Sequence, residues 1–166
     1  MAKKKIGDYE LDVTCLDDLK EIIDAMDSRS LDKLQRAALS RAARVIYDAT
    51  KGAALGMEPK FGNTNPQYND KIIDGVRMTL KQDSTNNWLA KVHILVTRKT
   101  GSQSYKLRFF EKGTEPRKTR QGYNRGQIKA LNFFSGAVNS TYNSAVSRLE
   151  DDFITEVEKY IDSKIK

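Results

Sequence analysis

Residues that carry enzyme chemistry are scarce in this sequence. The single histidine, His93, lies within an alternating apolar and polar segment, with no second histidine and no cysteine near it to complete a metal site. The single cysteine, Cys15, has no histidine neighbour in the sequence, so we interpret it as a small apolar residue. There is no glycine-rich phosphate loop and no nucleophile elbow. We therefore predict a protein that is not an enzyme and that uses no metal and no cofactor.

Glu111 and Glu115 form a carboxylate pair whose spacing could serve acid–base chemistry. A hydrolase or nuclease that uses both glutamates is one hypothesis. The alternative is structural: the Glu111 carboxylate meets a neighbouring arginine or caps the backbone amides of Gly113 and Thr114. We favour the structural alternative because a predicted turn separates the two glutamates.

A second candidate site is a run of cations in the segment 112–131, which we predict to be a basic loop. Gly122 and Gly126 keep this loop mobile, and Glu115 is its one acid. Four cations of the loop and three on the strands predicted before it are expected to contact a partner protein or DNA: Arg117, Lys118, Arg120 and Arg125, with Arg77, Lys106 and Arg108. Only Tyr123 and Phe110 could stack on a single strand there, and no helix-turn-helix or zinc pattern indicates sequence-specific DNA reading.

The charge of the chain is unevenly distributed. The net charge is +7, but residues 1–32 carry −4, residues 33–148 carry +14 and residues 149–166 carry −3. A cationic middle indicates an anionic partner, either nucleic acid or an acidic protein surface. The alternative is intramolecular, with the acidic end segments lying beside the basic middle.

Length and composition predict one soluble domain over residues 1–166. The hydrophobic fraction of 39% and the charged fraction of 31% fit a modest core with a large wet surface. No apolar run reaches the length of a membrane span, so we expect no membrane partner. The first residues are not followed by an apolar region, so we expect no secretory signal.

We expect the chain to be organised around residues 105–111. In an extended chain Tyr105, Leu107 and Phe109 fall on one face and Lys106, Arg108 and Phe110 on the other, and this alternation predicts a strand. This strand should stop at Glu111, because Gly113 can adopt a positive φ and Thr114 can bond nearby backbone. Phe133 and Phe134 should anchor the return of the basic loop to the core.

Periodicity also predicts which side of each element is apolar. The helix expected over residues 30–54 has Arg41 on its wet side and an apolar stripe of Leu31, Leu34, Ala38, Ala42, Val45, Ile46 and Ala49. A hairpin turn is expected at 83–87. One face of the predicted meander is apolar, and the other is a basic face of Arg77, Lys81, Lys91, His93, Lys106 and Arg108.

Periodicity predicts the remaining elements and an α+β fold. A small antiparallel β-meander of three to four strands packs against a long helix in the N-terminal half and a long C-terminal helix. The predicted bounds are a flexible tail at 1–8, a short strand at 9–14, a helical region at 17–54 broken near 28–30 with Ser30 capping the second helix, a loop at 55–71, a meander at 75–111 with strands at 75–81, 88–97 and 105–111, and a C-terminal helix at 136–164.

This order of elements resembles the head–tail joining proteins, also called neck or tail-completion proteins, of tailed bacteriophages. In that family a helix rich in Ala and Arg precedes a loop and a small meander, whose aromatic-rich last strand ends at a Glu-x-Gly-Thr turn. A loop with a proline then leads to a Phe-bearing anchor and a final helix. The matching parts, within about residues 30–160, are Leu34 to Ala49, Glu111-Lys-Gly-Thr114, and Asn132-Phe-Phe134 with Ala137.

The resemblance implies a structural virion protein rather than an enzyme. It would form a homo-oligomeric ring in the neck, between the portal or connector and the tail, with the genomic DNA passing through the lumen. Its partners would be itself, neighbouring neck, connector and tail proteins, and the DNA. It would be located in the virion, and in the host cytoplasm during assembly. The alternative, based on the cationic middle, is a free basic nucleic-acid-binding domain without sequence specificity.

The whole prediction, function included, depends on one picture: a small β-layer backed by helices, whose third strand stops at Glu111 and releases the basic loop toward another molecule. The prediction fails if residues 105–111 are wound into a helix, or if the basic loop is folded inward and buried within its own subunit.

Overall fold

The computed structural model describes residues 8–11, 26–57, 72–95 and 104–165, which form an α+β fold dominated by two long helices. The α+β class and the long helices are therefore as predicted. In chain order the elements are β1 (Asp8–Leu11), α2 (Ser28–Leu55), β2 (Val76–Gln82), β3 (Trp88–Ile94), the 3-10 helix η3 (Ser104–Lys106), α4 (Leu107–Lys112) and α5 (Phe133–Ile165).

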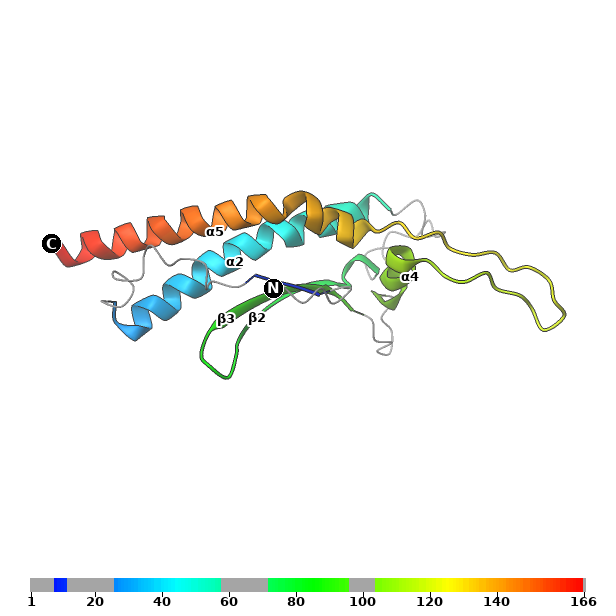
Figure 1. Ribbon diagram of the computed structural model, residues 1–166, viewed down its shortest axis with the longest axis horizontal. Coiled ribbons are helices and arrows are strands. Elements are labelled where there is room, and N and C mark those ends of the chain that lie inside the picture. Colours follow the sequence, from blue (N-terminus) through cyan, green and yellow to red (C-terminus); the bar gives the residue numbers. More distant parts are fainter. Residues whose placement is uncertain (1–7, 12–25, 58–71, 96–103, 166) are drawn as a thin grey trace.

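Helix α2 lies between the sheet and α5, so it is buried on two sides (Figure 1). Ala38 and Ala42, on the predicted apolar stripe, are fully buried. Leu39 and Ala43, outside that stripe, are buried as well because the helix contacts a second layer. Because the alanine side chain is small, the sheet and α5 can approach α2 closely here.

Helix α2 begins at Ser28, and its N-cap is Asp27, whose Oδ1 accepts a hydrogen bond of 3.0 Å from the backbone amide of Ser30. The prediction that Ser30 is the cap is therefore wrong. Asp27 has extended φ and ψ angles and reaches the third amide of the helix, which is the usual geometry of an N-cap. Most of the predicted helix at 17–27, of the tail at 1–8 and of the loop at 55–71 lies outside the described residues; of these segments, Asp8 belongs to β1 and residues 26–27 precede α2.

The sheet is antiparallel, in the order β1-β3-β2. Strands β2 and β3 form a hairpin close to the predicted bounds, with Val76 opposite Ile94 and Gln82 opposite Trp88. Their turn lies at the predicted position, because the Oδ1 of Asp83 accepts hydrogen bonds from the amides of two later turn residues, at 2.8 and 2.9 Å. Both strands contact α2, and the buried apolar residues of the hairpin are Val76, Ala90, Val92 and Ile94.

The predicted strand at 105–111 is wrong, because these residues are helical in η3 and α4. Leu107, Phe110 and Glu111 are the buried residues of α4, and their spacing of three and four is that of one helix face. The rings of Tyr105 and Phe109 meet edge to face at 6.1 Å, a contact that a helical turn creates. A short run that alternates apolar and charged residues fits either structure locally.

The predicted meander of three to four strands is not confirmed, because the described residues of the range 75–111, which are 75–95 and 104–111, supply only the two strands β2 and β3. Residues 105–111 are helical, so the picture with a third strand before Glu111 is refuted, and the functional prediction fails in the form that depended on that strand. The basic loop is not folded inward, because it extends away from the helices and the sheet (Figure 1).

Candidate functional site

The carboxylate of Glu111 caps the start of α5. It is 3% exposed, and its Oε2 accepts a hydrogen bond of 2.8 Å from the backbone amide of Phe134. Its Oε1 accepts hydrogen bonds from the backbone amide of Ser135, at 3.2 Å, and from the Ser135 hydroxyl. The first amides of a helix lack partners within the helix and carry the positive end of its dipole. A buried anionic side chain therefore fits this position.

The structural alternative predicted that the Glu111 carboxylate caps the backbone amides of Gly113 and Thr114. The carboxylate does cap backbone amides, but they are those of Phe134 and Ser135. The carboxylate therefore joins the end of α4 to the start of α5, across the entire basic loop. The backbone of α4 strengthens this joint, because the carbonyls of Phe110 and Glu111 accept from the amides of residues 131 and 132 at 2.8 and 3.3 Å.

Gly113 and Thr114 close the base of the basic loop. Gly113 has a φ of 72°, and a Cβ there would lie 2.8 Å from the carbonyl oxygen of Ile128 and 2.9 Å from the amide of Ala130. Thr114 donates its amide to the Ile128 carbonyl at 2.9 Å, and its hydroxyl accepts the Ile128 amide at 2.9 Å. The two ends of the loop therefore lie side by side, and only glycine fits at residue 113.

The residues predicted as structural meet in one place, which we call the root: Glu111, Gly113, Thr114, Phe133 and Phe134. Phe134 is fully buried and Phe133 is 7% exposed, in the same apolar cluster as Leu107 and Phe110. The root thus attaches the basic loop to the core of the protein, which is the role predicted for the two phenylalanines.

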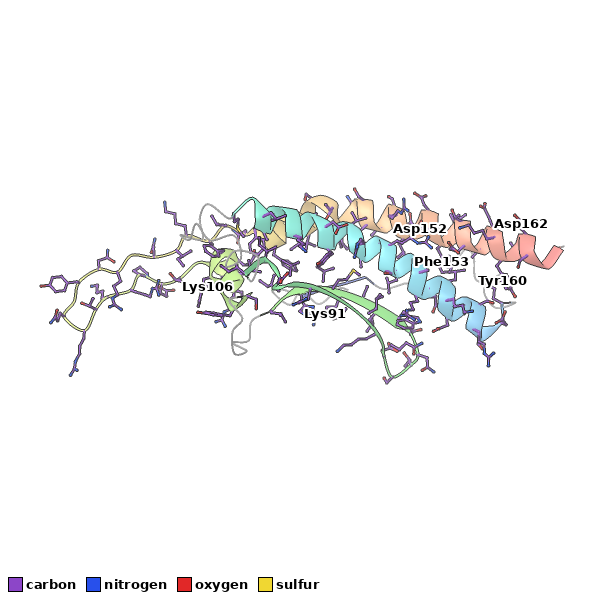
Figure 2. All side chains as sticks on the ribbon, turned by 180° about the vertical axis from the view of Figure 1, so that it is seen from behind. Lys91, Lys106, Asp152, Phe153, Tyr160 and Asp162 are labelled. Atoms are coloured by element: carbon purple, nitrogen blue, oxygen red, sulfur yellow. The ribbon has the colours of Figure 1, made fainter. Side chains whose placement is uncertain are left out.

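Residues 114–130, which we call the arm, form a narrow hairpin rather than a structureless loop. The amide of Arg117 donates to the carbonyl of Gly126 at 3.1 Å, and the amide of Thr119 donates to the carbonyl of Tyr123 at 2.8 Å. Gly122 and Gly126 have φ angles of 86° and 73°, so they shape the turns of the hairpin. Side chains stand clear of the helices along the length of the arm (Figure 2).

The arm is strongly cationic and exposed. Its five cations are exposed, as is its acid, Glu115. Among the described residues none of the five takes part in a salt bridge. Tyr123, near the tip, is 69% exposed. A two-stranded hairpin that has no packed face is only marginally stable in water by itself. Because its cations and Tyr123 are exposed, they are available to another molecule. The cations are Arg117, Lys118, Arg120, Arg125 and Lys129.

The other predicted contact residues are not gathered on one sheet face. Arg77 is exposed on β2, whereas Lys106 belongs to η3 and Arg108 is exposed on α4. The prediction of a shared basic face fails because residues 105–111 are not a strand. Figure 2 shows Lys106 beside α4 and Lys91 on the sheet, on separate parts of the molecule.

The two glutamates of the enzyme hypothesis occupy different environments. Glu111 is buried at the root and bound to α5, whereas Glu115 is exposed on the arm. Within residues 8–11, 26–57, 72–95 and 104–165, no group of three or more His, Cys, Asp or Glu side chains could hold a metal ion. The helices of the same residues include none that is long and apolar enough to cross a membrane.

An ion-pair network between the long helices was not anticipated. Arg41, predicted to lie on the wet side of α2, contacts Asp152 at 3.3 Å and Glu156 at 2.9 Å on α5. The hydrogen bond from Arg41 holds the pKa of Glu156 below its usual value, and the same bond raises the pKa of Arg41. Figure 2 shows Asp152 on α5 where the two helices run side by side. The network partly fits the intramolecular explanation of the charge pattern, although it does not involve the arm.

Comparisons with known proteins gave no match to any family, to any curated protein or to any solved structure.

Proposed function

We propose that this protein is a structural subunit of the neck of a tailed bacteriophage, where it forms a ring between the connector and the tail. The observation that supports the proposal best is the arm, a cationic hairpin that leaves the body and is held at its root by the Glu111 cap. An exposed, charged extension on a well-anchored base suits contact with another subunit, an adjoining ring or DNA in the lumen.

The Glu-x-Gly-Thr turn also supports the proposal. In this protein it ends a helix instead of a strand, so the aromatic strand of the phage resemblance contributes nothing here. What persists is the order of a long helix, a hairpin, the Glu111–Thr114 turn, a basic extension and a final helix that begins at buried phenylalanines. A turn that positions an extension is useful to an assembling subunit, whichever element precedes it.

The edge of the sheet offers a further contact surface. In the described sheet β2 is an outer strand, paired on one side to β3. Outer strands have unpaired backbone groups that a neighbouring chain can cover. Together with the arm, this edge is consistent with a homo-oligomeric ring, in which every subunit uses one surface as donor and another as acceptor.

The alternative is a free, basic nucleic-acid-binding domain without sequence specificity. The cations of the arm favour it, because they are exposed, form no salt bridge with another described residue, and can neutralise phosphates and release counterions. The two functions differ in what the arm requires: the neck protein needs protein neighbours, whereas the free domain needs only nucleic acid.

Co-expression with the proteins encoded beside its gene tests the neck proposal. The mass of the protein is measured alone and with each neighbour, and negative-stain microscopy looks for rings with a central hole. We expect incorporation into a ring or particle with at least one neighbour. A protein that stays monomeric in every combination and never joins particles would remove the proposal.

A titration with duplex and single-stranded DNA at two salt concentrations tests the alternative. Tight binding at low salt that weakens steeply as salt rises, without any protein neighbour, would support the free nucleic-acid-binding domain. No binding even at low salt would exclude it.

A further inference from the structure

Helix α5 has an acidic stripe along the C-terminal half of its exposed face. Helical spacing places Asp151, Glu158 and Asp162 opposite the buried Leu149, Phe153 and Val157, whereas Glu150 lies at the boundary between the exposed and the buried face. All four of its acids are exposed, and Ile154, which lies among them, is 44% exposed. The acids of this stripe are Glu150, Asp151, Glu158 and Asp162.

The stripe is not neutralised by the described part of the chain. The other two acids of this half of α5 are engaged: Asp152 with Arg41 and Arg148, and Glu156 with Arg41 and Lys159. No ion pair among the described residues involves any acid of the stripe. The protein therefore presents an exposed anionic surface on α5 and an exposed cationic surface on the arm.

The arm and the stripe lie at opposite ends of the molecule. Helix α5 begins at the root and runs away from the arm, and its C-terminal end lies at the far end of the longest axis (Figure 1). Figure 2 shows Asp162 at that far end. At a rise of about 1.5 Å per residue, the stripe lies roughly 25–45 Å along the helix from the root. The arm therefore cannot reach the stripe of its own chain, but it can reach the stripe of another copy.

We propose that the arm of one copy docks on the acidic stripe of a second copy, in a head-to-tail contact. Five cations of the arm face four carboxylates of the stripe. The stripe is about 18 Å long at the helical rise, and the cations of the hairpin, from Lys129 at its base to Arg120 near its tip, span about 23 Å at the rise of a strand. Tyr123 and Ile154 add an exposed apolar group on each side.

The contact deepens the proposed function and rests on it for its biological setting. Two different surfaces meet, so each copy keeps one arm and one stripe free for the next copy. Such a heterologous contact produces a ring if the rotation between copies closes, and an open chain if it does not.

Charge reversal with complementation tests this contact in the full-length chain. The arm variant carries Arg117→Glu, Arg120→Glu and Arg125→Glu, and the stripe variant carries Asp151→Lys, Glu158→Lys and Asp162→Lys. Sedimentation velocity measures association at roughly 100 µM protein, where weak contacts are visible. Like charges brought face to face should weaken association of either variant by about a hundredfold or more. Circular dichroism verifies that each variant is folded.

An equimolar mixture of the two variants gives the decisive measurement. The acidic arm of the first variant then meets the basic stripe of the second, and the native basic arm of the second meets the native acidic stripe of the first. We expect the mixture to associate although neither variant does so alone. A matched control with the same change of charge on α2, Arg29→Glu with Lys33→Glu and Arg44→Glu, changes three exposed cations and should associate like the natural chain.

Salt provides an independent check. Raising it from about 0.1 M to about 1 M shortens the Debye length from about 10 Å to about 3 Å and should dissolve the contact. The proposal is overturned if the natural chain stays monomeric at low salt, if the stripe variant associates normally, or if the mixture fails to associate. An arm variant that loses DNA binding but still associates like the natural chain also overturns it. Failure of the co-expression test with neck neighbours would leave this contact standing, so the two proposals can fail separately.

Discussion

Removing the Glu111 carboxylate should destabilise the protein more than removal of any exposed acid of the arm. The substitution Glu111→Ala leaves the amides of Phe134 and Ser135 and the Ser135 hydroxyl without the acceptor they use at the start of α5. The site is buried, and water does not easily replace the lost acceptor.

The size of the effect follows from the geometry. Loss of a helix cap costs about 0.5–2 kcal/mol, and a hydrogen bond to a charged group contributes about 1.5–3 kcal/mol. These contributions overlap, so we expect a loss of about 3 kcal/mol in the free energy of unfolding. For a chain of this size that corresponds to a decrease in Tm of roughly 6–12 °C.

Urea unfolding followed by circular dichroism measures the loss, with Glu115→Ala as the matched control. Glu115 is exposed on the arm, so its removal should change the urea midpoint little. Ser135→Ala removes one of the three donors and should lie between the two. If Glu111→Ala and Glu115→Ala unfold at the same urea concentration, the carboxylate does not hold the root and the account of the arm's attachment is wrong.

Three further predictions concern the root, the helix pair and the core. Gly113→Ala should cost about 2 kcal/mol or more, because a side chain at this φ is strained and its Cβ meets backbone; Gly122→Ala, at a similar φ with open space around it, should cost less in the same urea assay. Because Arg41 lowers the pKa of Glu156, that carboxylate contributes stability above its unfolded pKa of about 4.5, and the contribution is lost as the pH falls through the lowered value. Glu156→Gln should therefore make the loss of stability between about pH 5 and pH 3 shallower in acid titrations of the urea midpoint. Thr50→Val should leave Tm unchanged or raise it, because within the described residues the buried Thr50 hydroxyl has no hydrogen-bond partner; a marked fall in Tm would show that this hydroxyl is satisfied.

The local sequence determined those elements whose pattern of apolar residues repeats over many residues. The long helices α2 and α5 follow from apolar residues three and four apart, and the hairpin follows from alternation on both sides of the Asp83 turn. The positive φ of Gly113 was also foreseeable, because glycine is the residue that tolerates it. So was burial of Phe133 and Phe134 where the chain returns to the core.

Tertiary structure decided what short patterns leave open. Residues 105–109 alternate like a strand, yet residues 105–111 are helical, with Leu107 and Phe110 buried on one face of α4 and Glu111 reaching α5 from the same side. The partner of Glu111 lies 23 residues away in sequence, and no local spacing reveals such a contact. In the same way, only the packed structure shows that α2 is buried on two sides and that the arm points away from the acidic half of α5. Periodicity reports which side of an element is apolar, whereas the position of a charged surface relative to another depends on how the whole chain packs.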